Sequence, residues 1–151
     1  MAEQTPLLDQ LISALKLLPG VGQKTAQRMA FHLLKVDKDK ARALGTTIVQ
    51  AVDTIRHCER CRNYTENQIC DICASASRKV SQMCIVETPT DVMAIENGTS
   101  YNGVYFILMG KLSPLDGIGP DQIGLDQLEH RLQSGDLKEI ILATSSTMEG
   151  E

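Results

Sequence analysis

The chain has 151 residues, a hydrophobic fraction of 42% and a formal net charge of −4, which is the composition of an ordinary globular protein. No apolar run approaches the roughly 20 residues of a membrane-spanning helix. The first residues lack the basic and apolar regions of a secretory signal, so we expect a cytoplasmic protein. Aromatic residues are only 3% of the chain, which argues against a platform that stacks single-stranded bases on aromatic rings.

The charge is unevenly distributed along the chain. Residues 1–62 carry ten Lys/Arg and six Asp/Glu, a net charge of +4, whereas residues 63–151 carry five and thirteen, a net charge of −8. This division favours a polyanion as the partner of the first part and a protein or metal as the partner of the second. An ordinary solvated surface is the alternative, which a charge of +4 does not exclude.

Helical periodicity dominates the first third of the chain. Thr5 and Pro6 suit the start of a helix whose apolar face continues to Leu18. A second helix is predicted over residues 24–35 and a third from about residue 41 to 57. The second helix is expected to turn these side chains inward: Ala26, Met29, Ala30, Leu33 and Leu34.

The turn between the first two helices is a candidate anion site. Gly20 and Gly22 permit backbone conformations closed to other residues and let a flat surface approach closely. The next helix begins beside Lys24 and Arg28, and its free N–H groups and dipole favour a phosphate. A DNA backbone is the natural occupant. The plainer alternative is a tight turn with no ligand.

Four of the five cysteines form two Cys-x-x-Cys pairs with eight residues between the pairs. Two such pairs predict a tetrahedral thiolate site for one structural zinc ion, with the ligands Cys58, Cys61, Cys70 and Cys73. Disulfides are disfavoured in the cytoplasm, and a redox role suits one isolated pair better than two. Because four thiolates complete the tetrahedron, we expect His57 beside the metal or on the surface.

After residue 82 the pattern changes to short apolar strands that alternate with helices. Strands are predicted over residues 83–87, 104–109 and 139–143, and Cys84 is expected to be buried in the first. Thr88, Pro89 and Asp91 predict a capped helix that ends near Gly98. A loop over residues 110–120 precedes a helix that carries Ile123, Leu125, Leu128 and Leu132. This order predicts a parallel sheet with helices on both faces.

Several motifs resemble one protein family. Residues 18–28 read Leu-Pro-Gly-Val-Gly-Gln-Lys-Thr-Ala-Gln-Arg, the cysteine pairs follow, residues 87–91 read Glu-Thr-Pro-Thr-Asp, and residues 108–120 read Leu-Met-Gly-Lys-Leu-Ser-Pro-Leu-Asp-Gly-Ile-Gly-Pro. In this order they resemble the RecR family of bacterial recombination mediators. The resemblance implies an α+β multi-module fold: helix-hairpin-helix helices (1–57), a zinc knuckle (58–73) and a Toprim α/β domain (80–151).

The resemblance also bears on catalysis, because Toprim enzymes hold magnesium with a glutamate after the first strand and an Asp-x-Asp after the third. Glu87 matches the glutamate, but Ser145 and Thr147 stand where the aspartates would be. Neutral hydroxyls are weaker magnesium ligands than carboxylates. Glu87, Glu149 and Glu151 remain candidates for a weakly bound cation or a partner. The family usually has Asn-Pro where this chain has Ser145-Ser146.

By this resemblance we expect a non-catalytic DNA-binding protein that acts with RecO and RecF to load recombinase at single-strand gaps. Family members form dimers or tetrameric rings and continue beyond Glu151, so a shortened chain with an incomplete Toprim domain is expected. A magnesium-dependent Toprim nuclease, primase or topoisomerase-like enzyme is the main alternative. A protein–protein adaptor whose hairpin never meets DNA is a third.

Overall fold

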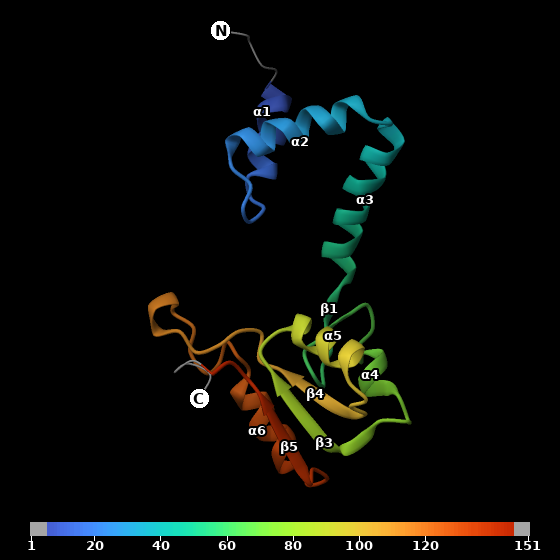
Figure 1. Cartoon of the computed structure of the whole chain (residues 1–151), viewed down its shortest axis with the longest axis vertical. Helices are drawn as coiled ribbons and strands as arrows, with labels where there is room; N and C mark the ends of the chain where they lie inside the picture. Colours follow the sequence, from blue (N-terminus) through green and yellow to red (C-terminus); the bar gives the residue numbers. More distant parts are fainter. Residues whose placement is uncertain (1–5, 147–151) are drawn as a thin grey trace. The chain divides into compact units, whose positions relative to one another are not determined.

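The computed structural model describes residues 6–146, and the chain divides into two compact units, Met1–Asp53 and Thr54–Glu151. Figure 1 shows helices alone in the first unit and a sheet with helices in the second. None of the described helices is both long enough and apolar enough to cross a membrane.

The first unit contains α1 (Pro6–Leu15), α2 (Gln23–Lys35) and α3 (Lys38–Thr54). Helices α1 and α2 pack through Ile12, Ala26 and Ala30. The predicted inward face of α2 is therefore only partly correct, since Met29 and Leu34 are 36% and 60% exposed. Helix α1 is also shorter than predicted, because its end tightens into a turn in which the Leu18 N–H donates to the Leu15 carbonyl.

The second unit begins with the cysteine knuckle, which in the structure comprises residues 56–74 and contains three short elements. Strand β1 (Arg56–His57) pairs antiparallel with β2 (Tyr64–Thr65), and α4 (Asp71–Ala74) follows. The third helix ends at Thr54 rather than continuing to the predicted residue 57, because the chain turns into β1.

A parallel three-stranded sheet follows, in the order β4-β3-β5. Its strands are β3 (Lys79–Val86), β4 (Gly103–Ile107) and β5 (Glu139–Ala143). β3 begins four residues before the predicted strand, and its first residues are offset by a register shift between Lys79 and Met83. β4 ends two residues early because the backbone at Met109 (φ 60°) and Gly110 (φ 138°) leaves the extended region.

Helices cover both faces of the sheet, as the strand–helix alternation predicts. On one face, α6 (Leu125–Gln133) places Leu128 in a core with Met83 and Phe106. On the other, α5 (Pro89–Gly98) places Val92 against Val86 and Tyr105. The predicted capping box at the start of α5 is confirmed by reciprocal hydrogen bonds between Thr88 and Asp91. The long loop after β4 contains a 3-10 turn (Pro114–Asp116) that the sequence pattern does not predict.

Candidate DNA-binding hairpin and zinc centre

The hairpin between α1 and α2 leaves its turn open to a ligand. Gly20 adopts a left-handed conformation (φ 76°), which favours glycine. Gly22 is the N-cap of α2 with φ −90°, a value open to any residue, and no side chain caps the helix there. A Cβ at either glycine would meet no atom within 4 Å. The fold therefore gives no steric reason for glycine at residue 22.

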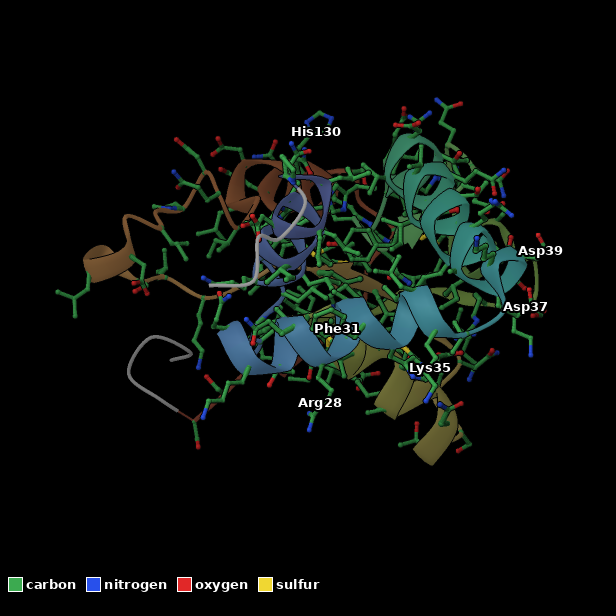
Figure 2. The ribbon with its side chains drawn as sticks, turned by 90° about the horizontal axis from the view of Figure 1, so that it is seen from above. Arg28, Phe31, Lys35, Asp37, Asp39 and His130 are labelled. Atoms are coloured by element: carbon green, nitrogen blue, oxygen red, sulfur yellow. The ribbon has the colours of Figure 1, made fainter. Side chains whose placement is uncertain are left out.

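Two cations stand beside this turn on the first turns of α2. Lys24 and Arg28 are four residues apart on the helix, so they share one face, and both are exposed. Figure 2 shows the Arg28 side chain pointing away from the α2 ribbon. A helix N-terminus with free N–H groups, a positive dipole end and two cations can bind a phosphate.

The four predicted zinc ligands converge. The sulfurs of Cys58, Cys61, Cys70 and Cys73 all lie within 4.8 Å of one another, and all four residues are buried. The Cys61 and Cys70 sulfurs are 3.5 Å apart. Backbone N–H groups already point at the sulfurs, since Cys70 N lies 3.3 Å from the Cys58 Sγ and Asn63 N lies 3.4 Å from the Cys61 Sγ. This set of buried donors fits one structural zinc ion.

The pKa values of the clustered cysteines also favour a bound cation. Hydrogen bonds from Cys61 and Cys73 lower the pKa of Cys70 to about 2. The hydrogen bond with Cys70, then the one with Cys73 and burial, raise the pKa of Cys61 far above its ordinary value. One thiolate is thus stabilised at the expense of its neighbours, and a dication would let all four sulfurs ionise together.

His57 is not one of the four clustered ligands. Its Nδ1 donates to the Arg62 carbonyl at 2.9 Å, and its ring stacks on Tyr64 with centroids 5.0 Å apart. It therefore supports the knuckle turn from the surface.

The knuckle covers the outer edge of β4. The Ile107 N–H donates to the Cys61 carbonyl at 2.9 Å, so the knuckle backbone satisfies a group that an edge strand would otherwise present to solvent. Arg131, from α6, donates to the Tyr105 carbonyl at 2.7 Å and to the Arg60 carbonyl at 2.9 Å. Knuckle and sheet are thus joined by direct hydrogen bonds.

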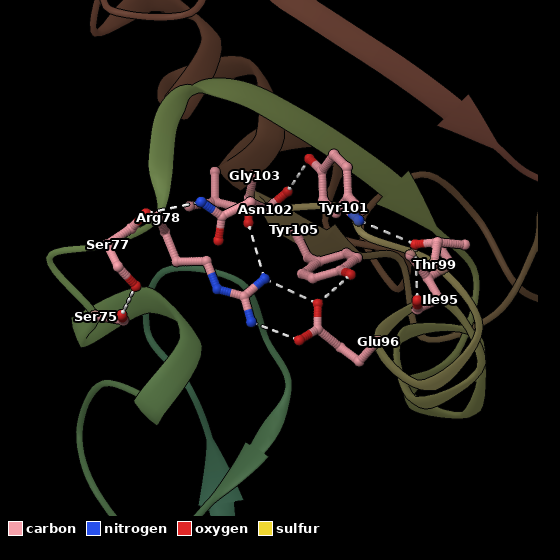
Figure 3. Close-up of polar contacts among 11 residues, drawn as sticks. Ser75, Ser77, Arg78, Ile95, Glu96, Thr99, Tyr101, Asn102, Gly103 and Tyr105 are labelled. Carbon is pink, nitrogen blue, oxygen red and sulfur yellow. Dashed lines mark hydrogen bonds and ion pairs between the residues drawn. The ribbon is translucent and has the colours of Figure 1, made fainter.

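Another arginine, Arg78, anchors residues 75–78, which connect α4 of the knuckle to β3. Arg78 pairs with both carboxylate oxygens of Glu96 on α5, and Tyr105 donates its hydroxyl to the same carboxylate (Figure 3). Asn102 donates from its side chain to the Ser77 carbonyl at 2.8 Å. These contacts fix residues 75–78 between α4 and β3.

The carboxyl edge of the sheet holds the remaining predicted residues. One Glu87 carboxylate oxygen accepts the Ser145 N–H at 2.8 Å, and the Lys111 amine lies 3.4 Å from the Ser145 hydroxyl. Glu87 thus closes the turn after β5. Thr147, Glu149 and Glu151 lie outside the described residues. The possible metal ligands within the described residues are one carboxylate and one hydroxyl, with an amine near the hydroxyl, and this set fits magnesium poorly.

Sequence reasoning missed the arginines that join the knuckle to the rest of its unit. Arg62 and Arg131 both donate to backbone carbonyls far away in the sequence. The available signal was the position of Arg62 directly after a zinc ligand, but nothing in the sequence specifies which carbonyl an arginine reaches.

Family models match three consecutive parts of the chain. The model described as "RecR, helix-hairpin-helix" matches residues 8–52, the model of the four-cysteine zinc finger domain of RecR matches 55–75, and "Toprim domain" matches 81–151. These are the modules expected from the motifs, in the expected order.

Curated relatives extend the similarity over nearly the whole chain. The chain is 55% identical to "Recombination protein RecR" of Xanthomonas oryzae pv. oryzae (strain MAFF 311018) over 145 residues, which are 96% of this chain and 74% of the relative. The proteins of the same description from Xanthomonas axonopodis pv. citri (strain 306) and Xylella fastidiosa (strain Temecula1 / ATCC 700964) are 54% and 53% identical, over 96% and 97% of this chain and 74% of each relative. On this similarity and on its three modules, the chain belongs to the RecR family of recombination proteins.

Proposed function

We propose that this chain is a non-catalytic, cytoplasmic and nucleoid-associated DNA-binding mediator of recombinational repair. In this proposal it acts with RecO and RecF proteins to load recombinase at single-strand gaps. The observation that carries the DNA-binding part is the exposed pair Lys24 and Arg28 beside the open N-terminus of α2. Membership of the RecR family supports the place in recombinational repair.

The hairpin would grip the DNA backbone without reading its sequence. Lys24, Arg28 and the first N–H groups of α2 suit phosphate oxygens, and phosphate contacts position a protein without specifying bases. Gly20 and Gly22 place no side chain at two positions of the turn, and the space beside both is open, so a phosphate can approach the backbone there. Binding of this kind releases counterions and weakens steeply as salt rises.

The test of the hairpin is the double variant Lys24→Ala/Arg28→Ala. We expect weaker DNA binding, and the slope of log affinity against log salt should shrink by about 0.9 per lost phosphate contact on duplex DNA or about 0.7 on single strands. Fluorescence anisotropy across a salt series measures both quantities. Arg42→Ala is a matched control, because Arg42 is an exposed cation of the same unit that pairs with Asp39.

A second variant tests the role of the open turn. Gly22→Ala should fold normally, because its backbone angles suit alanine and its Cβ would touch nothing, yet it should bind DNA less tightly.

Unchanged affinity at low salt in the Lys24→Ala/Arg28→Ala protein would contradict the hairpin proposal and favour an adaptor that does not meet DNA.

We further propose that the acidic second half provides the surfaces for RecO and RecF, and that the chain assembles as a dimer or tetrameric ring. The net charge of −8 over residues 63–151 disfavours a second DNA surface there and suits protein partners.

The absence of catalysis is tested with labelled DNA and magnesium. We expect no cleavage or strand passage, because Glu87 is engaged with the Ser145 N–H and hydroxyls replace two carboxylates. Magnesium-dependent cleavage that disappears in Glu87→Ala would instead identify a Toprim enzyme.

A further inference from the structure

The backbone of Arg62 is held by the cysteine knuckle. Arg62 follows Cys61 directly and adopts a left-handed conformation (φ 71°), which is uncommon for a residue with a side chain. Its N–H donates to the Cys58 carbonyl at 2.8 Å, and its carbonyl accepts from His57 Nδ1 at 2.9 Å. Cys58 and His57 therefore hold the backbone that sets the direction of the Arg62 side chain.

The side chain of Arg62 joins the two ends of the loop that follows β4. One guanidinium nitrogen donates to the Leu108 carbonyl and the other to the Gln122 carbonyl, both at 3.1 Å. The guanidinium carbon also lies 6.0 Å from the centre of the Phe106 ring. A Cβ at Gly124 would collide with the guanidinium, so the loop is built around this arginine.

We propose that Arg62 is a positioning residue through which zinc in the knuckle controls the conformation of the loop 108–124. Zinc bound by Cys58 and Cys61 would fix the turn that contains them, and this turn orients the Arg62 side chain. The planar guanidinium then holds both ends of the loop through its two hydrogen bonds. Lys111 lies in this loop and reaches the hydroxyl of Ser145, whose N–H donates to the Glu87 carboxylate. Zinc binding would thereby affect the loop at the carboxyl edge of the sheet, where ligands of α/β domains bind.

The alternative is that the loop holds its own shape. Leu112, Ile118 and Ile123 pack on the core below it, and Ser113 and Ile118 form a backbone bridge. In that case Arg62 would contribute little to the stability of the loop, because these apolar contacts do not involve the knuckle.

Hydrogen exchange of the zinc-loaded chain separates these two cases. In Arg62→Ala, the hydrogen-bonded amides of Ser113, Ile118 and Gln122 should exchange about tenfold faster or more, because hydrogen bonds to a charged group are among the stronger ones. The amides of β3 should keep their rates, and the zinc content should stay at one ion. Arg62→Lys should rescue only part of the protection, because an ammonium lacks the fork. Arg56→Ala is the matched control, since Arg56 pairs with Glu59 inside the knuckle.

A second pair of measurements keeps the proposal falsifiable if Arg62→Ala disturbs the knuckle. Gly124→Ala pushes the guanidinium from the loop side and also strains the left-handed backbone at this residue (φ 74°), so it should speed the same amides. In the double variant the clash is gone and only the strain remains, so the effects of the two substitutions should be less than additive. Removing zinc with a chelator should expose the loop while β3 stays protected. A loop that keeps its protection without zinc, or in both variants, would overturn the proposal.

Discussion

At the scale of single residues, the second unit contains a partly buried ionised network. The side chains of Arg78 and Glu96 are only 15% and 26% exposed, and Tyr105 is almost fully buried. Hydrogen bonding from Arg78 lowers the pKa of Glu96, and burial, then the hydrogen bond with Glu96, raises the pKa of Tyr105. Among the described residues, no buried side-chain nitrogen or oxygen lacks a partner. The carboxylate of Glu96 therefore serves two donors that would otherwise be poorly satisfied.

We predict that Glu96→Gln destabilises the protein by about 1–3 kcal/mol at neutral pH, because Arg78 loses its ionised partner. The pKa of Glu96 is lowered in the folded state, so its stabilisation is fully present above the unfolded pKa and is lost as the pH falls through the folded pKa. The gap between parent and variant should thus close on acidification. Urea unfolding from pH 7 to pH 3 measures it, with the exposed Glu66→Gln as control. A gap independent of pH would contradict the ionic role.

At the scale of elements, the features that were predictable from the sequence are those with local causes. The zinc ligands follow from cysteine spacing, the hairpin from two glycines between apolar helices, and the start of α5 from Thr88 and Asp91, which bond each other across three residues. The strand β5 has the bounds that the sequence predicts, because a short apolar run lies between polar segments.

The unpredicted features depend on contacts between distant segments. β3 begins at Lys79 because its N–H donates to the Asn102 carbonyl, which the local polar sequence does not reveal. The edge of β4 is covered by the Cys61 carbonyl of the knuckle, which precedes β4 in the chain, and by Arg131, which follows it. Long side chains such as Arg62 reach partners forty or more residues away, so spacing rules carry no information about them.

At the scale of the whole molecule, apolar side chains of the first unit remain exposed, among them Met29 and Leu34 of α2, whose burial the sequence pattern predicts. Leu44, Ile48 and Val52 recur every fourth residue on α3 and are 49%, 55% and 77% exposed. No described residue of α3 is buried. A groove of about 520 Å³ within the same unit is lined largely by apolar side chains, including Leu18, Met29 and Leu44. Apolar surface of this extent typically marks an interface.

We predict that these α3 side chains are covered by a second copy of the chain. Ile48→Glu should lower the mass in solution, because a charge placed in an apolar interface cannot be hydrated. Sedimentation velocity at matched concentrations measures the mass, and circular dichroism checks that the helices remain. Thr46→Glu adds the same charge on the opposite side of α3 and should leave the mass unchanged.

Assembly should also govern DNA affinity, although Ile48 is distant in sequence from Lys24 and Arg28. Each copy contributes one weak phosphate-binding hairpin. When several copies are joined, binding of the first hairpin raises the effective concentration of the others at the DNA, so the affinity rises without any new type of contact. Ile48→Glu should therefore weaken DNA binding and reduce its salt dependence together, whereas Thr46→Glu should change neither. If Ile48→Glu lowers the mass but leaves the affinity and the salt slope unchanged, one hairpin accounts for all DNA binding and the assembly has another purpose.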